Sequence, residues 1–184
     1  MLVLPGAPAA SAFRLARQFE RLRRLDPHIV ALHSRYLHFV QCERSLSAAQ
    51  RAALERLLEA PGGVQLSEGP QTLTVAPRPG TISPWSSKAT DIARVCGLQF
   101  VGRIERGIHY QLDGPLSVPP SVLAAVLHDR MTEAVFTRSS DAAALFAVHA
   151  PRPLAFIALA AGRSALQAAN EPLGLALVAD EIDY

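Results

Sequence analysis

The order of secondary-structure patterns constrains this fold most, because the same four-element plan occurs twice along the chain. Residues 1–5 and 72–77 are short apolar runs typical of strands. Each run is followed by a helical pattern, a long strand pattern and a second helical pattern. Equivalent positions lie 72 residues apart at three points: Ser11 and Ser83, Tyr36 and Ile108, Ser47 and Pro119. We therefore predict an α+β fold in which two pseudo-repeated strand–helix–strand–helix units share a mostly antiparallel sheet, with helices packed on one face.

The predicted helices begin at caps that the sequence identifies. Ser11, Ser47 and Ser83 each precede a segment with helical periodicity. Gln50 completes a capping box with Ser47, and Pro84 occupies the first helical position, where proline is favoured. Helical spacing predicts that the following side chains face inward: Ala12, Leu15, Ala16, Phe19, Leu22, Ala53, Leu54, Leu57, Leu58, Ile92, Val95, Cys96, Val122, Leu123, Val126, Leu127 and Met131.

The long strand patterns cover residues 29–41 and 103–112, and the second of them alternates clearly. One face carries Ile104, Ile108, Tyr110 and Leu112, and the other carries Arg103, Glu105, His109 and Gln111. This alternation predicts a strand with one buried and one exposed face. Arg106 is the exception, a charged residue on the apolar face beside Gly107.

Composition favours a soluble cytoplasmic protein. The chain has 184 residues, 49% of them apolar and 18% charged, which is typical of a globular protein. Its net charge of +2 does not favour nucleic acid as a partner. Two cysteines, Cys42 and Cys96, are too few for a disulfide framework or a zinc site and suit a reducing compartment. No membrane span or signal peptide is expected, since no apolar stretch is long enough.

The chain is expected to divide into residues 1–150 and 151–184. Pro151 and Pro153 indicate a linker, and 164–170 reads as a short helix. Asp180 is a good helix cap followed by acidic residues, yet the sequence stops at Tyr184. This second part is therefore expected to be a connector and the truncated start of a further helical domain.

The segment from Arg78 to Asp91 is the best chemical candidate. It gathers hydroxyl side chains and Lys88, the only lysine among 18 basic residues, at a predicted helix N-terminus. It is not a P-loop, because the Gly-Lys-Ser/Thr order is absent. Trp85, the only tryptophan, has little local core to fill and is expected to pack across an interface. The residues alone leave two interpretations open: a helix cap with exposed hydroxyls, or a contact with a ligand or partner.

No catalytic residue, metal site or cofactor site is predicted in this chain. The six histidines show no metal-binding spacing, and neither cysteine has an activating neighbour pattern. No nucleophile, base and orienting group occur together. A stand-alone RNA- or phosphate-binding module is the alternative, based on a stripe of basic residues: Arg14, Arg17, Arg21 and Arg24. A solvated helix face explains the same stripe.

Five segments resemble one family in the same order. They are RPGTISPWSSKATDIA (78–93), RIERG (103–107), LHDRMTE (127–133), LGLAL (173–177) and DEIDY (180–184). The first looks like the signature near the start of the large, single-chain phosphoribosylformylglycinamidine synthases, which are formylglycinamide ribonucleotide amidotransferases. The resemblance spans almost the whole chain. Pro172 departs from the pattern, where a helix-compatible residue is expected.

The resemblance implies the N-terminal domain of an ATP- and glutamine-dependent ligase of de novo purine biosynthesis. The full enzyme would convert formylglycinamide ribonucleotide to formylglycinamidine ribonucleotide, with ATP and magnesium in its synthetase domains and a cysteine nucleophile in its glutaminase. The chain by itself is expected to be inactive, with its partners the synthetase and glutaminase domains of the same polypeptide and neither nucleic acid nor a membrane. The repeat would reflect a fused dimer of the small subunit of multi-subunit versions.

The resemblance also assigns a role to the candidate segment. The domain would dock the glutaminase to the synthetase and help to enclose the path of ammonia. The expected contact residues are Arg78, Thr81, Ser83, Trp85, Ser86, Ser87 and Lys88, with Arg78 orienting the others.

Overall fold

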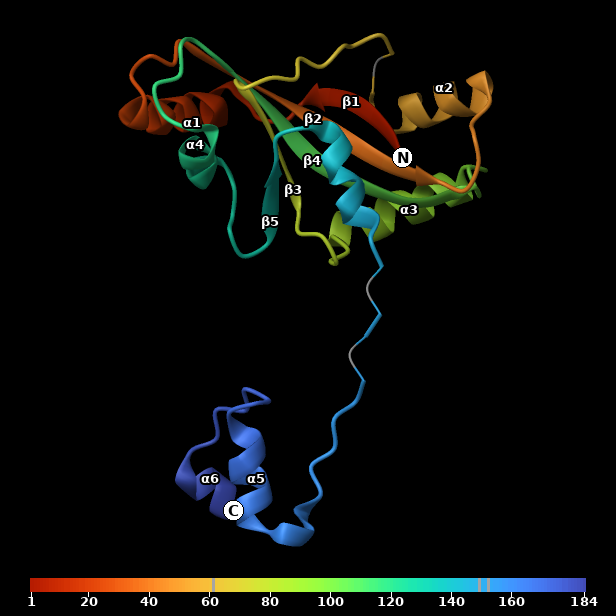
Figure 1. Cartoon of the computed structure of the whole chain (residues 1–184). Helices are drawn as coiled ribbons and strands as arrows, with labels where there is room; N and C mark the ends of the chain where they lie inside the picture. The colour runs from red at the N-terminus through yellow and green to blue at the C-terminus, as the bar shows by residue number, and fades with distance from the viewer. Residues whose placement is uncertain (61, 149, 152) are drawn as a thin grey trace. The chain divides into compact units, whose positions relative to one another are not determined.

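The strand patterns form one five-stranded antiparallel sheet, seen in a computed structural model that describes residues 1–184 except 61, 149 and 152. The strands are β1 (Leu2–Pro8), β2 (Ala31–Cys42), β3 (Thr72–Pro77), β4 (Val101–Asp113) and β5 (Glu133–Phe136), in the order β1-β2-β4-β3-β5 (Figure 1). Every pairing is antiparallel. The α+β prediction is confirmed. The chain divides into two compact units, Met1–Val148 and His149–Tyr184, described separately below.

The two long strands form the centre of the sheet. Tyr36 of β2 lies directly opposite Ile108 of β4. These two residues are 72 positions apart, and β1 and β3 flank the central pair on its two sides. The arrangement fits two units related about the Tyr36–Ile108 pair. The duplication itself stays a prediction, because residue identity between the halves is slight.

The helices of the first unit are α1 (Ala12–Leu25), α2 (Ala48–Leu57), α3 (Pro84–Val95) and α4 (Pro120–Leu127). Their predicted starts are confirmed: the hydroxyls of Ser11, Ser47 and Ser83 each accept a backbone hydrogen bond from the first turn. Gln50 completes the capping box of α2, and Pro84 is at the first position of α3. These local signals fix the register of each helix, because they satisfy N–H groups that the helix leaves free.

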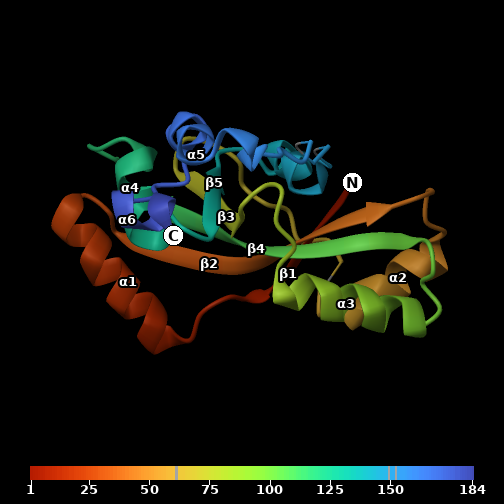
Figure 2. The same cartoon turned by 90° about the horizontal axis from the view of Figure 1, so that it is seen from below.

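Two apolar cores lie between these helices and one face of the sheet. The first core joins Leu54 of α2 and Ala93 of α3 to Val40 and Ile104 of the central strands. The second joins α1 and α4 to the other end of the same face, with its buried members Leu22, Ile29, Leu32, Leu73, Val75, Tyr110, Leu112, Leu123, Ala124 and Leu127. Figure 2 shows α1 near one end of β2 and β4, and α2 and α3 near the other end.

The opposite face of the sheet is also covered, which the alternation in 103–112 did not predict. Leu37 and Phe39 pack there with Ala142 and Leu145 of the 3₁₀ helix η1 (Ser139–Phe146). Glu105 is consequently fully buried on a face that was expected to be exposed. Polar residues on this face therefore need partners within the chain.

Three predicted helix faces, those of α1, α3 and α4, are wrong in part. On α3 the buried residues are Ser86, Thr90 and Ala93, whereas Ile92 and Val95 are exposed. Cys96 is also exposed, as are Ala12 and Ala16 on α1. On α3 the reason is the partial pairing of β4 with β3, which covers only residues 108–111 of β4. The N–H of Ile104 lies outside this pairing and donates to the hydroxyl of Thr90 at 3.0 Å. Thr90 therefore faces the sheet.

The face of α4 also differs from the prediction. The helix ends at Leu127, and Met131 lies beyond it with 77% of its surface exposed. Val122 is exposed as well, while Leu123 and Leu127 are buried as expected. Because the helix is short, the apolar pattern in the sequence extends past its end.

The second unit contains η2 (Leu159–Ala161), α5 (Arg163–Asn170) and α6 (Ala179–Asp183), and none of its described residues is buried. The cap of α6 is Val178, and Asp180 lies in the first turn instead of capping the helix. Arg163 forms an ion pair with Asp183 within this unit. The predicted linker includes residue 152, which lies outside the described residues. In the described part of the chain, no helix has the length and apolar character needed to span a bilayer.

Candidate docking site at the start of α3

The loop from β3 to α3 is hydrogen-bonded to two other segments, strand β4 and the segment before β5. The backbone N–H of Arg78 donates to the carbonyl of Thr132 at 3.1 Å, and the hydroxyl of Thr81 donates to the carbonyl of Arg78 at 2.7 Å. Arg103 of β4 donates to the carbonyl of Thr81 at 2.5 Å and to that of Leu145 at 3.1 Å. These hydrogen bonds hold the loop against β4 and the segment before β5, and Arg103 also connects β4 to η1.

A buried carboxylate, that of Glu105, binds Ser83, the N-cap residue of α3. Glu105 accepts hydrogen bonds from the Ser83 hydroxyl at 2.8 Å and from the Ser83 N–H at 3.2 Å. The same carboxylate pairs with the Arg103 guanidinium. The Ser83 hydroxyl in turn accepts the N–H of Ser86 at 3.0 Å. Because a buried charge is stable only with such partners, this network fixes where α3 begins.

The predicted contact residues differ in their exposure. Arg78, Thr81, Ser87 and Lys88 are exposed, and Ser83 and Trp85 are half-buried. Ser86 is fully buried, so the expected exposure of its side chain is wrong. The structure brings these residues together on one turn of loop and the first turns of α3. Their contact with a partner stays a prediction.

Trp85 lies in α3, and much of its ring packs against other residues of this chain. It packs against the first core and stacks on His38 of β2, with ring centroids 5.7 Å apart and planes 28° apart. Burial and the neighbouring Arg106 lower the pKa of His38 to about 4, so the ring is neutral at pH 7. Trp85 is half-buried, and the rest of its side chain faces solvent.

Arg106 joins this aromatic group. Its guanidinium carbon lies 4.5 Å from the Trp85 ring centroid and 4.3 Å from that of Tyr36, both within cation–π range. From the sequence, Arg106 was expected to be a charge on an apolar face, while Tyr36, His38 and Glu105 were not associated with the site. The register of β2 and β4 places Arg106, Tyr36 and His38 on one face, and the packing of α3 adds Trp85.

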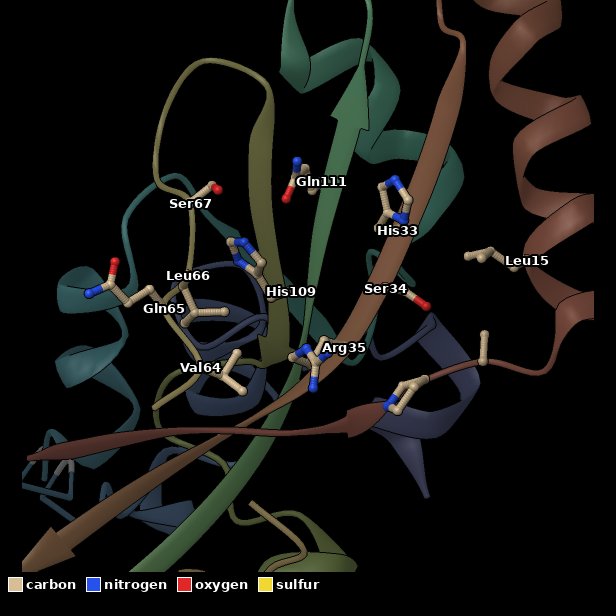
Figure 3. A pocket seen from close by; sticks show the side chains of 12 residues that line it. Leu15, His33, Ser34, Arg35, Val64, Gln65, Leu66, Ser67, His109 and Gln111 are labelled. Carbon is tan, nitrogen blue, oxygen red and sulfur yellow. The ribbon is translucent and has the colours of Figure 1, made fainter. Parts of the chain in front are cut away.

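A separate cavity of about 410 Å³ lies at the edge of β2, on the far face of the sheet (Figure 3). His33, Arg35, His109 and Gln111 line it together with residues 64–67. Most of these groups are already paired: His33 and Gln111 with Asp113, His109 with Thr74, and Arg35 with the carbonyl of Gly6. Burial lowers the pKa of His109. Among the described residues, two buried polar atoms of this lining have no hydrogen-bond partner, Ser34 Oγ and His109 Nε2.

The arginine stripe and the two cysteines lie outside the docking site. The stripe of Arg14, Arg17, Arg21 and Arg24 is exposed on α1. Cys42 and Cys96 are free thiols, and burial raises the pKa of Cys42. Within the described residues, no three or more histidine, cysteine or acidic side chains are grouped so that they could hold a metal ion.

The fold and the site together define a class: an α+β domain with a loop that is hydrogen-bonded to the sheet at the start of a helix. Comparison with protein families gives the assignment. Residues 35–146 match the family described as "Formylglycinamide ribonucleotide amidotransferase N-terminal". The match covers more than half of the chain, and the chain belongs to this family. It is therefore a domain of an enzyme of purine biosynthesis, as the resemblance indicated.

Proposed function

We propose that this domain is a docking element that holds the glutaminase and synthetase parts of the amidotransferase together and helps to enclose the path of ammonia. One observation supports the proposal most. The start of α3 is fixed by the buried Glu105–Arg103 pair, yet it presents Thr81, Ser87 and Lys88 to solvent. A rigid, exposed loop loses little conformational entropy when a partner binds.

The types of side chain in the loop also suit this role. Hydroxyl groups and one aromatic ring can close an interface without binding a small neutral molecule tightly. Ammonia needs exclusion of bulk water more than strong hydrogen bonds along its path. A partner can cover the exposed part of Trp85 at little cost, because an indole ring is largely apolar.

The chemical step belongs, on this proposal, to other domains of the enzyme. ATP and magnesium would bind there, since this chain has no P-loop sequence and no metal-binding group among its described residues. The isolated chain would carry no ligase activity. We place the enzyme in the cytoplasm, as its free cysteines and its biosynthetic role suggest.

The test compares two nitrogen donors in the full-length enzyme. Trp85→Ala and Lys88→Ala should each lower turnover with glutamine by about tenfold, the scale of losing one contact of about 1.4 kcal/mol. Turnover with added ammonia should change by no more than about twofold, because the synthetase does not need the docked glutaminase for that substrate. Val95→Ala, at a residue 87% exposed on the same helix, is the matched control and should change neither. Equal losses with both donors would contradict the coupling role.

A further inference from the structure

Arg106 lies at the boundary between the two cores on the helix-bearing face. Its neighbours along β4 differ in their surroundings: Ile104 is buried in the first core, and Ile108 packs against the second. Arg106 itself is half-buried, opposite His38 in the register of β2 and β4. A charged side chain at such a position needs a specific reason, because desolvation of a guanidinium is unfavourable.

Within the described part of the chain, the guanidinium of Arg106 makes no hydrogen bond and no ion pair. Its contacts are the rings of Tyr36 and Trp85, at 4.3 Å and 4.5 Å from the guanidinium carbon. Aromatic rings interact with the face of a guanidinium and leave its N–H groups, which lie in the guanidinium plane, free to donate elsewhere. The group is therefore positioned but not neutralised.

The residues around Arg106 supply no anion. His38 is neutral at pH 7, and the adjacent carboxylate of Glu105 lies on the opposite face, where Ser83 and Arg103 occupy it. Lys88, one turn beyond Trp85 on α3, is an exposed positive charge. The chemistry that complements this surface is an anion with two acceptor oxygens, which a guanidinium can bind in bidentate geometry.

The apolar surroundings favour a protein partner. Tyr36 and Trp85 are half-buried, and Ile82 in the adjoining loop is 64% exposed. A small free anion would leave these surfaces in water, whereas a docked protein surface would cover them. Tryptophan, tyrosine and arginine are also the residue types that dominate binding energy at protein interfaces.

We propose that Arg106, held by Tyr36 and Trp85, is the anchor that pairs with an aspartate or glutamate side chain on the protein surface docked against the start of α3. This proposal rests on the docking role proposed above and adds to it the chemistry of the partner. Covering the pair would remove it from water and strengthen the two charge-assisted hydrogen bonds.

The direct test is zero-length cross-linking of the full-length enzyme carrying Arg106→Lys. A carbodiimide joins an amine to a carboxylate only when the two are in contact, so mass spectrometry should find position 106 linked to an aspartate or glutamate outside residues 1–148. Arg94→Lys is the matched control, because the Arg94 guanidinium donates to the carbonyls of Val101 and Gly102 and has no acidic partner among the described residues. A link from position 106 only to acidic residues within 1–148, or no link, would overturn the proposal.

A second measurement separates this proposal from the docking role. Arg106→Met keeps an unbranched side chain and removes the charge, and it should lower turnover with glutamine by about tenfold while turnover with ammonia stays within about twofold. Unchanged turnover with ammonia also shows that the variant is folded. If Trp85→Ala uncouples the enzyme but Arg106→Met does not, the docking role stands and the anchor fails. If position 106 is cross-linked but Trp85→Ala leaves coupling intact, the anchor stands and the coupling role fails.

Discussion

Asp26 and Ser117 lie 91 residues apart in the sequence, and the carboxylate of the first binds both donors of the second. Its oxygens accept the Ser117 N–H at 2.6 Å and the Ser117 hydroxyl at 2.8 Å. Burial would raise the pKa of Asp26, but hydrogen bonds from Ser117, His28 and Val118 outweigh it and bring the pKa well below its usual value. This carboxylate joins the end of α1 to the segment that precedes α4.

Asp26→Asn should therefore lower the midpoint of urea unfolding at pH 7. The wild-type carboxylate contributes its full stability above the unfolded pKa of about 3.9, and this contribution is lost as the pH falls toward the lower folded pKa. The difference between wild type and variant should shrink below about pH 4. Asp113→Asn, at an exposed carboxylate that contacts His33, serves as the control. A difference that stays constant from pH 7 to pH 3 would contradict this assignment.

The stability of the domain should also depend on His38. Its pKa is lowered from 6.5 to about 4, so the folded state favours the neutral ring. The contribution of His38 to the free energy of unfolding is therefore fully present above pH 6.5. It decreases by up to about 3 kcal/mol as the pH falls from 6.5 to about 4. His38→Phe keeps an aromatic ring beside Trp85 and should flatten the dependence. His33→Gln should not flatten it, because His33 is exposed.

The buried pair behind the docking loop gives a third prediction. Glu105→Gln leaves Arg103, whose side chain is only 17% exposed, without a charged partner, and should lower the free energy of unfolding by about 3 kcal/mol. Glu55→Gln removes an i,i+4 pair with the more exposed Arg51 and should cost no more than about 0.5 kcal/mol. Urea unfolding at pH 7 measures both. Equal losses would show that Glu105 does not organise the start of α3.

Gly107 and Gly102 form a matched pair on β4. A Cβ at Gly107 would lie 2.6 Å from the Val75 carbonyl oxygen, whereas a Cβ at Gly102 would meet its nearest atom at 3.5 Å. Gly107→Ala should therefore destabilise the domain by about 2 kcal/mol, and Gly102→Ala should change stability by less than about 0.5 kcal/mol. Urea unfolding of the two variants checks the close approach of β3 to β4.

Much of the fold could be predicted from local signals. Ser11, Ser47 and Ser83 mark the starts of three helices because capping is a short-range interaction that the sequence displays directly. The alternation in 103–112 likewise placed Arg106 on the correct face. Tyr36 and Ile108, expected to be equivalent positions, lie opposite each other in the sheet.

What could not be predicted depends on contacts between distant segments. Glu105 was expected to be exposed because its neighbours alternate, and only the position of η1 shows that the second face is covered. The predicted buried face of α3 was wrong because the unpaired edge of β4 needs a hydrogen-bond acceptor, which the Thr90 hydroxyl supplies. Helical periodicity alone favoured Ile92, which is exposed. Trp85 was expected to be free for a partner because its packing against His38 of β2 and the first core is a contact between distant segments. The burial of Ser86 was likewise not expected.

The central claim, that the start of α3 is a surface covered by other parts of the enzyme, is tested most directly by hydroxyl-radical footprinting. The isolated chain is compared with the full-length enzyme under identical conditions. Trp85 and Ile82 should react readily in the isolated chain and become protected in the full-length enzyme, while Phe13 on α1, which is 71% exposed, keeps its reactivity. Equal reactivity of Trp85 and Ile82 in both proteins would contradict the account.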